Sequence, residues 1–468
     1  MYITFTGNKI KEFWKKYKIF ILIFFIALCA RVFLFSVNLN HTGYDLVGAI
    51  HADDGYYEIS QGLIQGHGFS GSTALPFKPD SLRPPVWIFI IAFLAKIFGS
   101  YWSVFVLELL IGSSIPILGM LIARKITSKK AVWIGTGILL SVEPYGVLLS
   151  SLLYSETMFT FLFLIFFIFL IRYFENKSLR NLVWMTVFLG LATLVKPTVQ
   201  YIPIILVLVM LFEARNNLTK QVVGHAIISL GLFCLVIAPW IYRNHREFGV
   251  FGMSAQPAFN LYVYLVPTVL SYDNHTSFKT EVDILLKKDN LDVNSITLSN
   301  GDYYQAQALA VLKNHKVALI KSIGTTLVTF FTHDGMLTVF QNAGVVIPVT
   351  ISKPALVLLL SDPTSFMKTI ELYVQGPGSV ILLVRCLWIL ITVLFFIGVV
   401  LYLKKEKINT LILMALFLVV YFALTTSING LGVNARFRVP VNTFIFTFAL
   451  YGLFSLKKDK MLSLPEKR

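Results

Sequence analysis

The sequence predicts an all-α, polytopic transmembrane protein with about 10–12 spans, and three observations support this fold class. Hydrophobic residues make up 56% of the chain and charged residues only 14%, with a mean hydropathy of +0.74, whereas soluble domains carry about 25% charged residues. Apolar runs of about 17–25 residues recur along the chain, and each is long enough to cross a bilayer. The net charge of +16 comes largely from basic residues in short segments between these runs. That is the positive-inside pattern of a membrane protein, so no nucleic-acid partner is expected.

The N-terminal part predicts one transmembrane helix followed by an outer loop. Several lysines precede an apolar run over about 19–37, which lacks a small-residue cleavage site and therefore predicts an uncleaved span with a cytoplasmic N-terminus. Residues 38–102 then form the first outer loop. Within it, Pro85–Phe98 is apolar but only about 14 residues long, which favours an interfacial helix over a span. This placement also keeps the basic residues of 124–130 on the cytoplasmic side.

The remaining apolar runs alternate between the two sides of the membrane. The region 317–361 is interrupted by His333-Asp334-Gly335 and fits either two spans or re-entrant helices. The basic pair Lys457-Lys458 places the C-terminus in the cytoplasm. Further spans are expected near residues 103–123, 131–149, 155–172, 181–195, 199–212, 222–240, 380–403, 409–426 and 439–456.

Three segments follow from this threading. We expect a catalytic transmembrane module over 1–250, an outer or re-entrant substrate region over 251–376, and C-terminal transmembrane helices over 377–468. The predicted location is the inner (plasma) membrane of a cell, with many passes.

Ionisable residues near the spans gather at their outer ends. A charged group close to hydrocarbon is costly and usually has a functional reason, so we expect an active site on the outer face. In the first loop, Asp53 and Asp54 stand at the start of a short helix, where the helix dipole stabilises carboxylates; a plain N-cap is the alternative interpretation. The residues in question are Asp53, Asp54, Arg83, Glu143, Glu156, Lys196, Arg243, Arg246, Arg436 and Arg438.

Six short motifs occur in order along the chain, each beside a predicted outer end. They resemble motifs of the GT-C superfamily of lipid-phosphate-sugar glycosyltransferases, in particular bacterial aminoarabinose transferases and protein mannosyltransferases. The resemblance fades between about 255 and 430. The motifs are 52–57 (ADDGYY), 81–87 (SLRPPVW), 154–156 (YSE), 190–198 (GLATLVKPT), 238–244 (APWIYRN) and 435–440 (ARFRVP).

The resemblance implies roles for the carboxylates. Asp53 is the expected general base, which takes the proton of an acceptor hydroxyl as that hydroxyl attacks the anomeric carbon. A one-step displacement of this kind inverts the configuration at the sugar. Glu156 is expected to orient the acceptor or Asp53, with capping of its helix as the alternative, and Asp54 to share a proton or a metal ion with Asp53.

The resemblance also implies basic ligands for the donor phosphate. Charge-assisted donors would bind the phosphate and stabilise charge on the leaving oxygen; the alternative for each is snorkelling toward lipid headgroups. Tyr57 and Tyr154 are candidate substrate contacts. The candidate phosphate ligands are Lys196, Arg83, Arg243, Arg436 and Arg438.

No cofactor or metal site is expected. The three cysteines, Cys29, Cys234 and Cys386, lie inside apolar runs without metal-ligand spacing. The acidic pair Asp53 and Asp54 leaves a divalent cation as an alternative.

The expected function is a membrane glycosyltransferase that moves a sugar from a polyprenyl-phosphate donor to a hydroxyl of a lipid, glycan or protein. Two alternatives remain open. A flippase for lipid-linked sugars would carry charges near mid-membrane and show broken helices and internal symmetry. A related ligase or polymerase would use a lipid-diphosphate donor.

Overall fold

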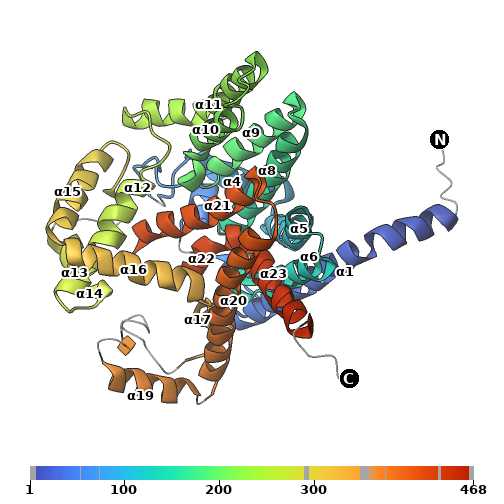
Figure 1. Ribbon diagram of the computed structural model, residues 1–468. Helices are drawn as coiled ribbons and strands as arrows, with labels where there is room; N and C mark the ends of the chain where they lie inside the picture. Colours follow the sequence, from blue (N-terminus) through green and yellow to red (C-terminus); the bar gives the residue numbers. More distant parts are fainter. Residues whose placement is uncertain are drawn as a thin grey trace.

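The computed structural model describes residues 7–52, 54–72, 74–288, 295–347, 358–359, 362–374, 376–430 and 434–462. Within these ranges every regular element is a helix (Figure 1), as the fold class predicted. The elements are α1 Gly7–His41, α2 Leu46–Ile50, α3 Tyr56–Gln65, α4 Pro85–Phe98, α5 Trp102–Ile126, α6 Lys130–Val142, α7 Pro144–Leu149, α8 Glu156–Asn176, α9 Leu179–Thr193, η1 Pro197–Val199, α10 Ile202–Glu213, α11 Lys220–Phe248, α12 Gln256–Phe259, η2 Asn260–Leu265, α13 Val266–Asp273, α14 Phe278–Lys288, α15 Gly301–Asn314, α16 Lys316–Thr332, α17 Met336–Asn342, α19 Pro363–Val374, α20 Gly378–Lys405, α21 Thr410–Thr426, η4 Ser427–Asn429, α22 Asn434–Arg438, η5 Val439–Val441 and α23 Asn442–Leu462.

Seven of the described helices are long and apolar enough to cross a membrane. Four shorter apolar helices accompany them, over Pro85–Phe98, Lys130–Val142, Leu179–Thr193 and Pro197–Glu213. The prediction of a polytopic helical membrane protein is thereby confirmed. The seven candidate spans are Tyr17–His41, Trp102–Ile126, Glu156–Asn176, Lys220–Phe248, Gly378–Lys405, Thr410–Asn429 and Ala435–Leu456.

The expected span over 131–149 is wrong in one respect, because two helices occupy it. Helix α6 ends at Val142 and α7 begins at Pro144. Proline lacks an N–H and fits the first position of a helix. The Glu143 carboxylate caps α7 by accepting from the backbone N–H groups of Tyr145 (3.3 Å) and Gly146 (2.6 Å). The break therefore has a local chemical cause.

Helices α20 and α23 pack closely against each other, and α5 and α6 also pack against α23. A Cβ atom at Gly398 would lie 1.8 Å from the carbonyl oxygen of Phe448, and one at Gly452 would lie 2.7 Å from that of Leu394. Small residues at facing positions allow helix backbones to approach this closely in a membrane.

The first loop is held against the bundle through α4. The N–H of Val86, in the first turn of α4, donates to the carbonyl of Leu194 at 3.1 Å, which satisfies one of the free amides at that helix end. Helix α3 begins after Gly55 (φ 77°) and α4 ends before Gly99 (φ 64°), both in the left-handed region that glycine adopts without strain. The predicted helix over Pro85–Phe98 forms with those bounds.

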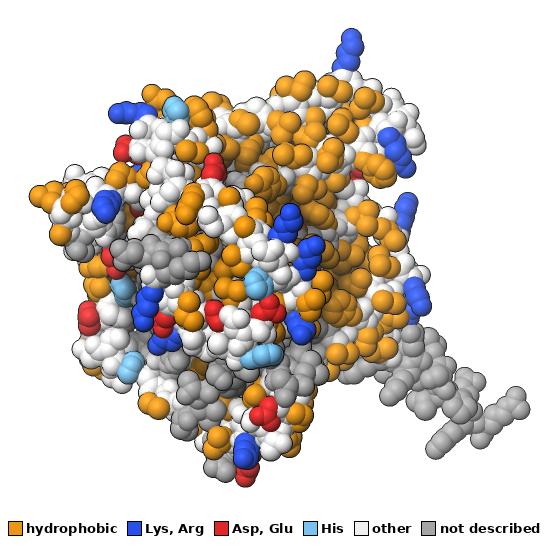
Figure 2. Space-filling model, turned by 90° about the vertical axis from the view of Figure 1, so that its left-hand side faces the viewer, with side chains coloured by type: hydrophobic (Ala, Val, Ile, Leu, Met, Phe, Trp, Pro, Cys, Tyr) orange, Lys and Arg blue, Asp and Glu red, His pale blue; other side chains and the backbone are white. Residues whose placement is uncertain are grey.

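Helices α12 to α15 form a second, smaller packing unit. Its apolar core includes Phe259, Tyr262 and Val266 and also takes in Leu82 of the first loop. These helices lie on the left of Figure 1, opposite the start of α1. Seen from that side in Figure 2, a broad hydrophobic area borders an area where acidic, basic and histidine side chains gather. Such apolar surface is typical of a protein whose solvent is lipid.

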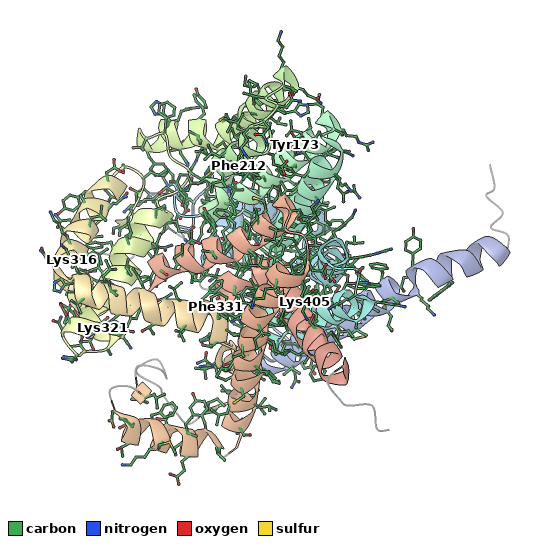
Figure 3. All side chains as sticks on the ribbon, in the orientation of Figure 1. Tyr173, Phe212, Lys316, Lys321, Phe331 and Lys405 are labelled. Atoms are coloured by element: carbon green, nitrogen blue, oxygen red, sulfur yellow. The ribbon has the colours of Figure 1, made fainter. Side chains whose placement is uncertain are left out.

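The interrupted region 317–361 forms α16, a break at His333–Gly335, and α17. Lys316 and Lys321 lie at one end of α16 and Phe331 at the other (Figure 3). Residues 348–357 and 360–361 lie outside the described ranges, so the choice between two spans and re-entrant helices stays open.

Candidate active site

Arg436 of α22 lies at the centre of a cluster of ionised side chains. Its Nε donates to Glu156 Oε1 at 2.6 Å and its Nη2 donates to Glu156 Oε2 at 3.1 Å. The same Nη2 also pairs with the carboxylate of Asp54. The guanidinium lies 4.0 Å from the centre of the Tyr154 ring, a cation–π contact. Three of the six sequence motifs therefore meet at this one arginine.

Lys196 is the second cation of the cluster. Its Nζ donates to Glu156 Oε1 at 2.5 Å and lies 4.8 Å from the ring centre of Phe437. The backbone of Lys196 is extended (φ −148°) because Pro197 follows it, and this turn directs the side chain away from α9. Glu156, the first residue of α8, is 0% exposed. A buried carboxylate needs such paired and hydrogen-bonded cations.

Arg83 approaches the cluster from the first loop. Its Nε donates to the backbone carbonyl of Asp54. Its own backbone is fixed by Asp80, whose Oδ1 accepts from the N–H groups of Leu82 (2.9 Å) and Arg83 (2.8 Å). Arg83 therefore lies beside Asp54, on the loop side of the cluster.

The loop and turn residues of the cluster have perturbed pKa values. Burial alone would raise the pKa of Asp54, but the guanidinium groups of Arg436 and Arg83 outweigh it and lower the pKa to about 2. Burial lowers the pKa of the Lys196 ammonium, and Glu156 offsets only part of that effect. Burial raises the pKa of Asp80, with Arg83 acting in the opposite direction. Perturbed groups gathered in one place are typical of functional sites.

Two predicted phosphate ligands lie elsewhere. Arg243 donates through Nη1 to the Asp80 carbonyl at 2.8 Å and lies over the rings of Phe69 and Trp240, so it fastens the first loop to α11. Arg438 is fully buried and donates to backbone carbonyls of the α16–α17 break. Neither residue contacts the Arg436 cluster through these bonds.

The remaining predicted site residues divide in the same way. Tyr154 joins the cluster through Arg436. Tyr57 instead lies in an aromatic group with its ring centre 5.1 Å from that of Tyr101 and 5.8 Å from that of His51. Asp53, the expected general base, lies outside the described residues, between Ala52 and Asp54, which are described.

The described residues contain no group of three or more His, Cys, Asp and Glu side chains that could hold a metal ion. The cluster instead pairs each carboxylate with a cation, and such pairs leave little negative charge for a divalent ion. Since Asp53 lies outside the described ranges, metal independence stays a prediction.

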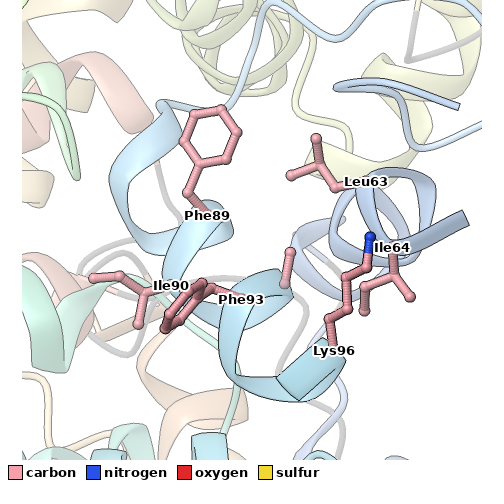
Figure 4. Close-up of a pocket in the computed structure, with 7 residues that line it drawn as sticks. Leu63, Ile64, Phe89, Ile90, Phe93 and Lys96 are labelled. Carbon is pink, nitrogen blue, oxygen red and sulfur yellow. The ribbon is translucent and has the colours of Figure 1, made fainter. Parts of the chain in front are cut away.

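An apolar groove lies between α3 and α4. Its volume is about 470 Å³, within the range of ligand sites. Figure 4 shows Leu63 and Ile64 of α3 facing Phe89, Ile90 and Phe93 of α4, with Lys96 at one end. Helix α4 begins two residues after Arg83, so the groove and the cluster share one chain segment.

Two contacts were not predicted from the sequence, and they differ in whether a local pattern could have revealed them. Asp80 precedes the motif that contains Arg83 and was not singled out, although an Asp two or three residues before a turn commonly accepts backbone N–H bonds. The ion pair between Asp334 and Arg385 joins two positions 51 residues apart, and no pattern in the sequence relates them.

The described structure is thus that of a polytopic helical membrane protein with a carboxylate–cation cluster at the ends of its helices. Residues 82–242 match the family described as dolichyl-phosphate-mannose-protein mannosyltransferase, which confirms the resemblance inferred from the motifs. The matched part includes Arg83, Glu156 and Lys196. Among curated proteins no sequence matches the chain.

Solved structures provide weaker likenesses. The archaeal oligosaccharyltransferase AglB from Archaeoglobus fulgidus, in complex with an inhibitory peptide and a dolichol-phosphate, is 14% identical, with a TM-score of 0.48 over 97% of this chain and 53% of that one. This chain thus spans about half the length of AglB. ArnT from Cupriavidus metallidurans bound to undecaprenyl phosphate is 15% identical, with a TM-score of 0.37 over 94% of this chain and 78% of that one.

Proposed function

We propose that this protein transfers a sugar from a polyprenyl-phosphate donor to an acceptor hydroxyl at the outer face of the membrane, with inversion at the anomeric carbon. The observation that carries the proposal is the pairing of Arg436 and Lys196 with the single buried carboxylate of Glu156. Arg83 lies beside this group through its bond to Asp54. Three cations held at one place by ion pairs and hydrogen bonds suit an anionic leaving group.

In the proposed reaction the acceptor oxygen attacks the anomeric carbon while the bond from that carbon to the phosphate oxygen breaks. The acceptor proton passes to the Asp53 carboxylate, and the departing group is a polyprenyl phosphate monoester. Arg436, Lys196 and Arg83 bind that phosphate and stabilise its growing charge. Glu156 holds the first two of these cations in place before the donor arrives. The transferred sugar is a hexose or a pentose.

The groove between α3 and α4 is the proposed site for the first part of the polyprenyl chain. Its walls are the apolar side chains of Phe89 and Phe93 on one side and Leu63 on the other. Arg83 at the start of this segment binds the phosphate, so an attached hydrocarbon chain can follow α4 away from the cluster.

The distribution of basic residues supports an outer position for the site. Three helices carry basic side chains at or near the end that lies away from the cluster. These side chains are Lys125 on α5, Arg172 on α8 and Lys405 on α20. The positive-inside rule places those ends in the cytoplasm and Glu156, at the opposite end of α8, outside. Labelling of single cysteines by a membrane-impermeant maleimide tests this orientation, with Leu75→Cys at an exposed position of the first loop and Lys405→Cys at the end of α20, each in a protein without Cys29, Cys234 and Cys386. Reaction at 405 in intact cells would contradict it.

The test of the proposed function is product analysis with purified protein in nanodiscs. Polyprenyl-phosphate mannose and polyprenyl-phosphate aminoarabinose serve as donors, and release of free polyprenyl phosphate is measured together with the anomeric configuration of the product. Asp53→Asn is expected to lower the rate by about 10² or more, while Asp283→Asn, an exposed carboxylate on α14, leaves it unchanged. In proteoliposomes, movement of intact donor across the bilayer without turnover would identify a flippase. Turnover of a polyprenyl-diphosphate sugar in place of these donors, with release of polyprenyl diphosphate, would identify a ligase.

A further inference from the structure

Arg438 faces away from the cluster that Arg436 occupies. The two arginines are two positions apart in α22, and residues at this spacing lie on different sides of a helix. Arg438 is 0% exposed. Its guanidinium lies 3.4 Å from the ring centre of Trp388 on α20. A charge buried this deeply must have specific partners.

Those partners are the free carbonyl groups at the end of α16. Arg438 Nη1 donates to the carbonyl of Phe330 at 2.7 Å, and Nη2 donates to that of His333 at 2.7 Å. The last carbonyl groups of a helix accept no hydrogen bond from within that helix, and they carry partial negative charge. Arg438 therefore caps α16 with both terminal nitrogens, which leaves them committed to protein rather than to a phosphate.

The break that receives Arg438 is itself fixed by neighbouring helices. The Oδ1 of Asp334 accepts from the N–H of Met336 at 2.8 Å, and its other oxygen pairs with Arg385 of α20. Thr392 of α20 donates to the carbonyl of Phe331 at 2.8 Å. The α16–α17 break thus has a defined position relative to α20.

Two further contacts leave the break little freedom. Burial and the nearby Arg385 lower the pKa of His333 to about 4, so its imidazole is neutral and Nδ1 accepts from the N–H of Gly335 at 3.1 Å. Gly335 has φ 71°, and a Cβ atom there would lie 2.2 Å from the ring of Tyr145 on α7. Only glycine fits this approach.

From these contacts we propose that Arg438, held by the α16–α17 break and its Asp334–Arg385 ion pair, is a positioning residue that sets where Arg436 lies. This inference rests on the proposed function, in which Arg436 binds the donor phosphate. It also gives the break at His333–Gly335 a role, which is to hold Arg438. Arg438 touches neither donor nor acceptor. It acts by fixing α22 from behind, so that the guanidinium of Arg436 meets Glu156 and Asp54.

A double-mutant cycle tests the proposal, with binding of undecaprenyl phosphate to protein in nanodiscs as the measurement. Arg436→Ala is expected to weaken affinity about tenfold or more, because it removes charge-assisted hydrogen bonds to the phosphate. Arg438→Met is expected to cause a loss of similar size, because it displaces Arg436. The double variant is expected to bind no more weakly than Arg436→Ala alone, because Arg438 acts through Arg436. Arg438→Lys restores part of the affinity, and Arg246→Met, an exposed arginine on α11, is the matched control. Independent, multiplying losses in the double variant would overturn the proposal.

A second measurement needs no ligand and separates this inference from the proposed function. An electron cryo-microscopy structure of Arg438→Met is expected to show Arg436 displaced from Glu156, with the transmembrane bundle intact. If Arg438→Met does not fold, Asp334→Asn, which keeps the oxygen that accepts from Met336 but loses the charge paired with Arg385, serves instead. An unchanged Arg436–Glu156 contact would refute the positioning role whatever the protein binds. Absence of polyprenyl phosphate binding in the unmodified protein would refute the proposed function alone.

Discussion

Arg436 and Glu156 lie 280 positions apart in the chain, and the guanidinium of one meets both oxygens of the other at 2.6 and 3.1 Å. This two-point geometry fixes the orientation of both side chains. It also joins α22 to the start of α8. Because Glu156 is buried and also pairs with Lys196, the three side chains depend on one another for their stability.

Removing the Glu156 carboxylate should destabilise the protein. Glu156→Ala leaves Arg436 and Lys196 without their shared buried partner, and breaking a buried pair in this way costs about 3–5 kcal/mol. Thermal unfolding of the detergent-solubilised variant measures the effect. Glu175→Ala is the control, since its pair with Lys125 is exposed and worth about 0–1 kcal/mol. Equal unfolding temperatures for the two variants would contradict the prediction.

Asp54 should stabilise the protein at all but strongly acidic pH. Its pKa is lowered from 3.8 to about 2, so its ion pair with Arg436 contributes fully above pH 4 and is lost as the pH falls through about 2. The stability difference between unmodified protein and Asp54→Asn should therefore be constant between pH 5 and 7 and shrink below pH 4. A difference that changes between pH 5 and 7 would show that Asp54 titrates normally.

Lys196 should contribute to donor affinity through its charge. Lys196→Met is expected to weaken binding of undecaprenyl phosphate about tenfold or more, since a charge-assisted hydrogen bond is worth about 1.5–3 kcal/mol. Lys196→Arg should retain part of the affinity. Lys125→Met, at an exposed position, is expected to bind normally, and normal binding by Lys196→Met as well would remove Lys196 from the phosphate site.

The contribution of the groove between α3 and α4 to binding affinity should depend on the length of the lipid chain. Phe93→Glu places a charge in the groove wall, so it should weaken binding of undecaprenyl phosphate far more than that of a short prenyl phosphate. Ile97→Glu introduces the same charge on α4 at an exposed position that does not line the groove. Competition binding with both phosphates measures the ratio, and equal effects of the two variants would place the chain elsewhere.

Much of the fold was predictable because hydrophobic length is a local property. The apolar runs located the long helices, and the bounds of Pro85–Phe98 agree with α4. The sequence also indicates a helix end at Glu143-Pro144, because proline and a capping carboxylate are local signals, although the expected span continued to 149 and the structure begins α7 at Pro144. The expected span from 439 begins instead as η5, with α23 starting at Asn442.

The candidate site was predictable only in part. Motif resemblance selected Glu156, Lys196 and Arg436 individually, and the structure brings them together. The motif resemblance could not distinguish the role of Arg436 from that of Arg438, because both residues belong to one motif. Only the packing of α22 decides which side each residue faces. The pairing of Asp334 with Arg385 depends on where α16 meets α20, which no local pattern encodes.

The hydrogen bond from Val86 to Leu194 has a consequence for how the membrane acts on this protein. It joins the first turn of α4 to the segment two residues before Lys196, so vertical displacement of α4 displaces the ammonium group as well. An interfacial helix follows the level of the lipid headgroups. With α4 at its expected interfacial position, bilayer thickness would act mechanically on the proposed catalytic centre. We therefore expect acyl-chain length in reconstituted vesicles to alter turnover even when donor and acceptor concentrations are unchanged.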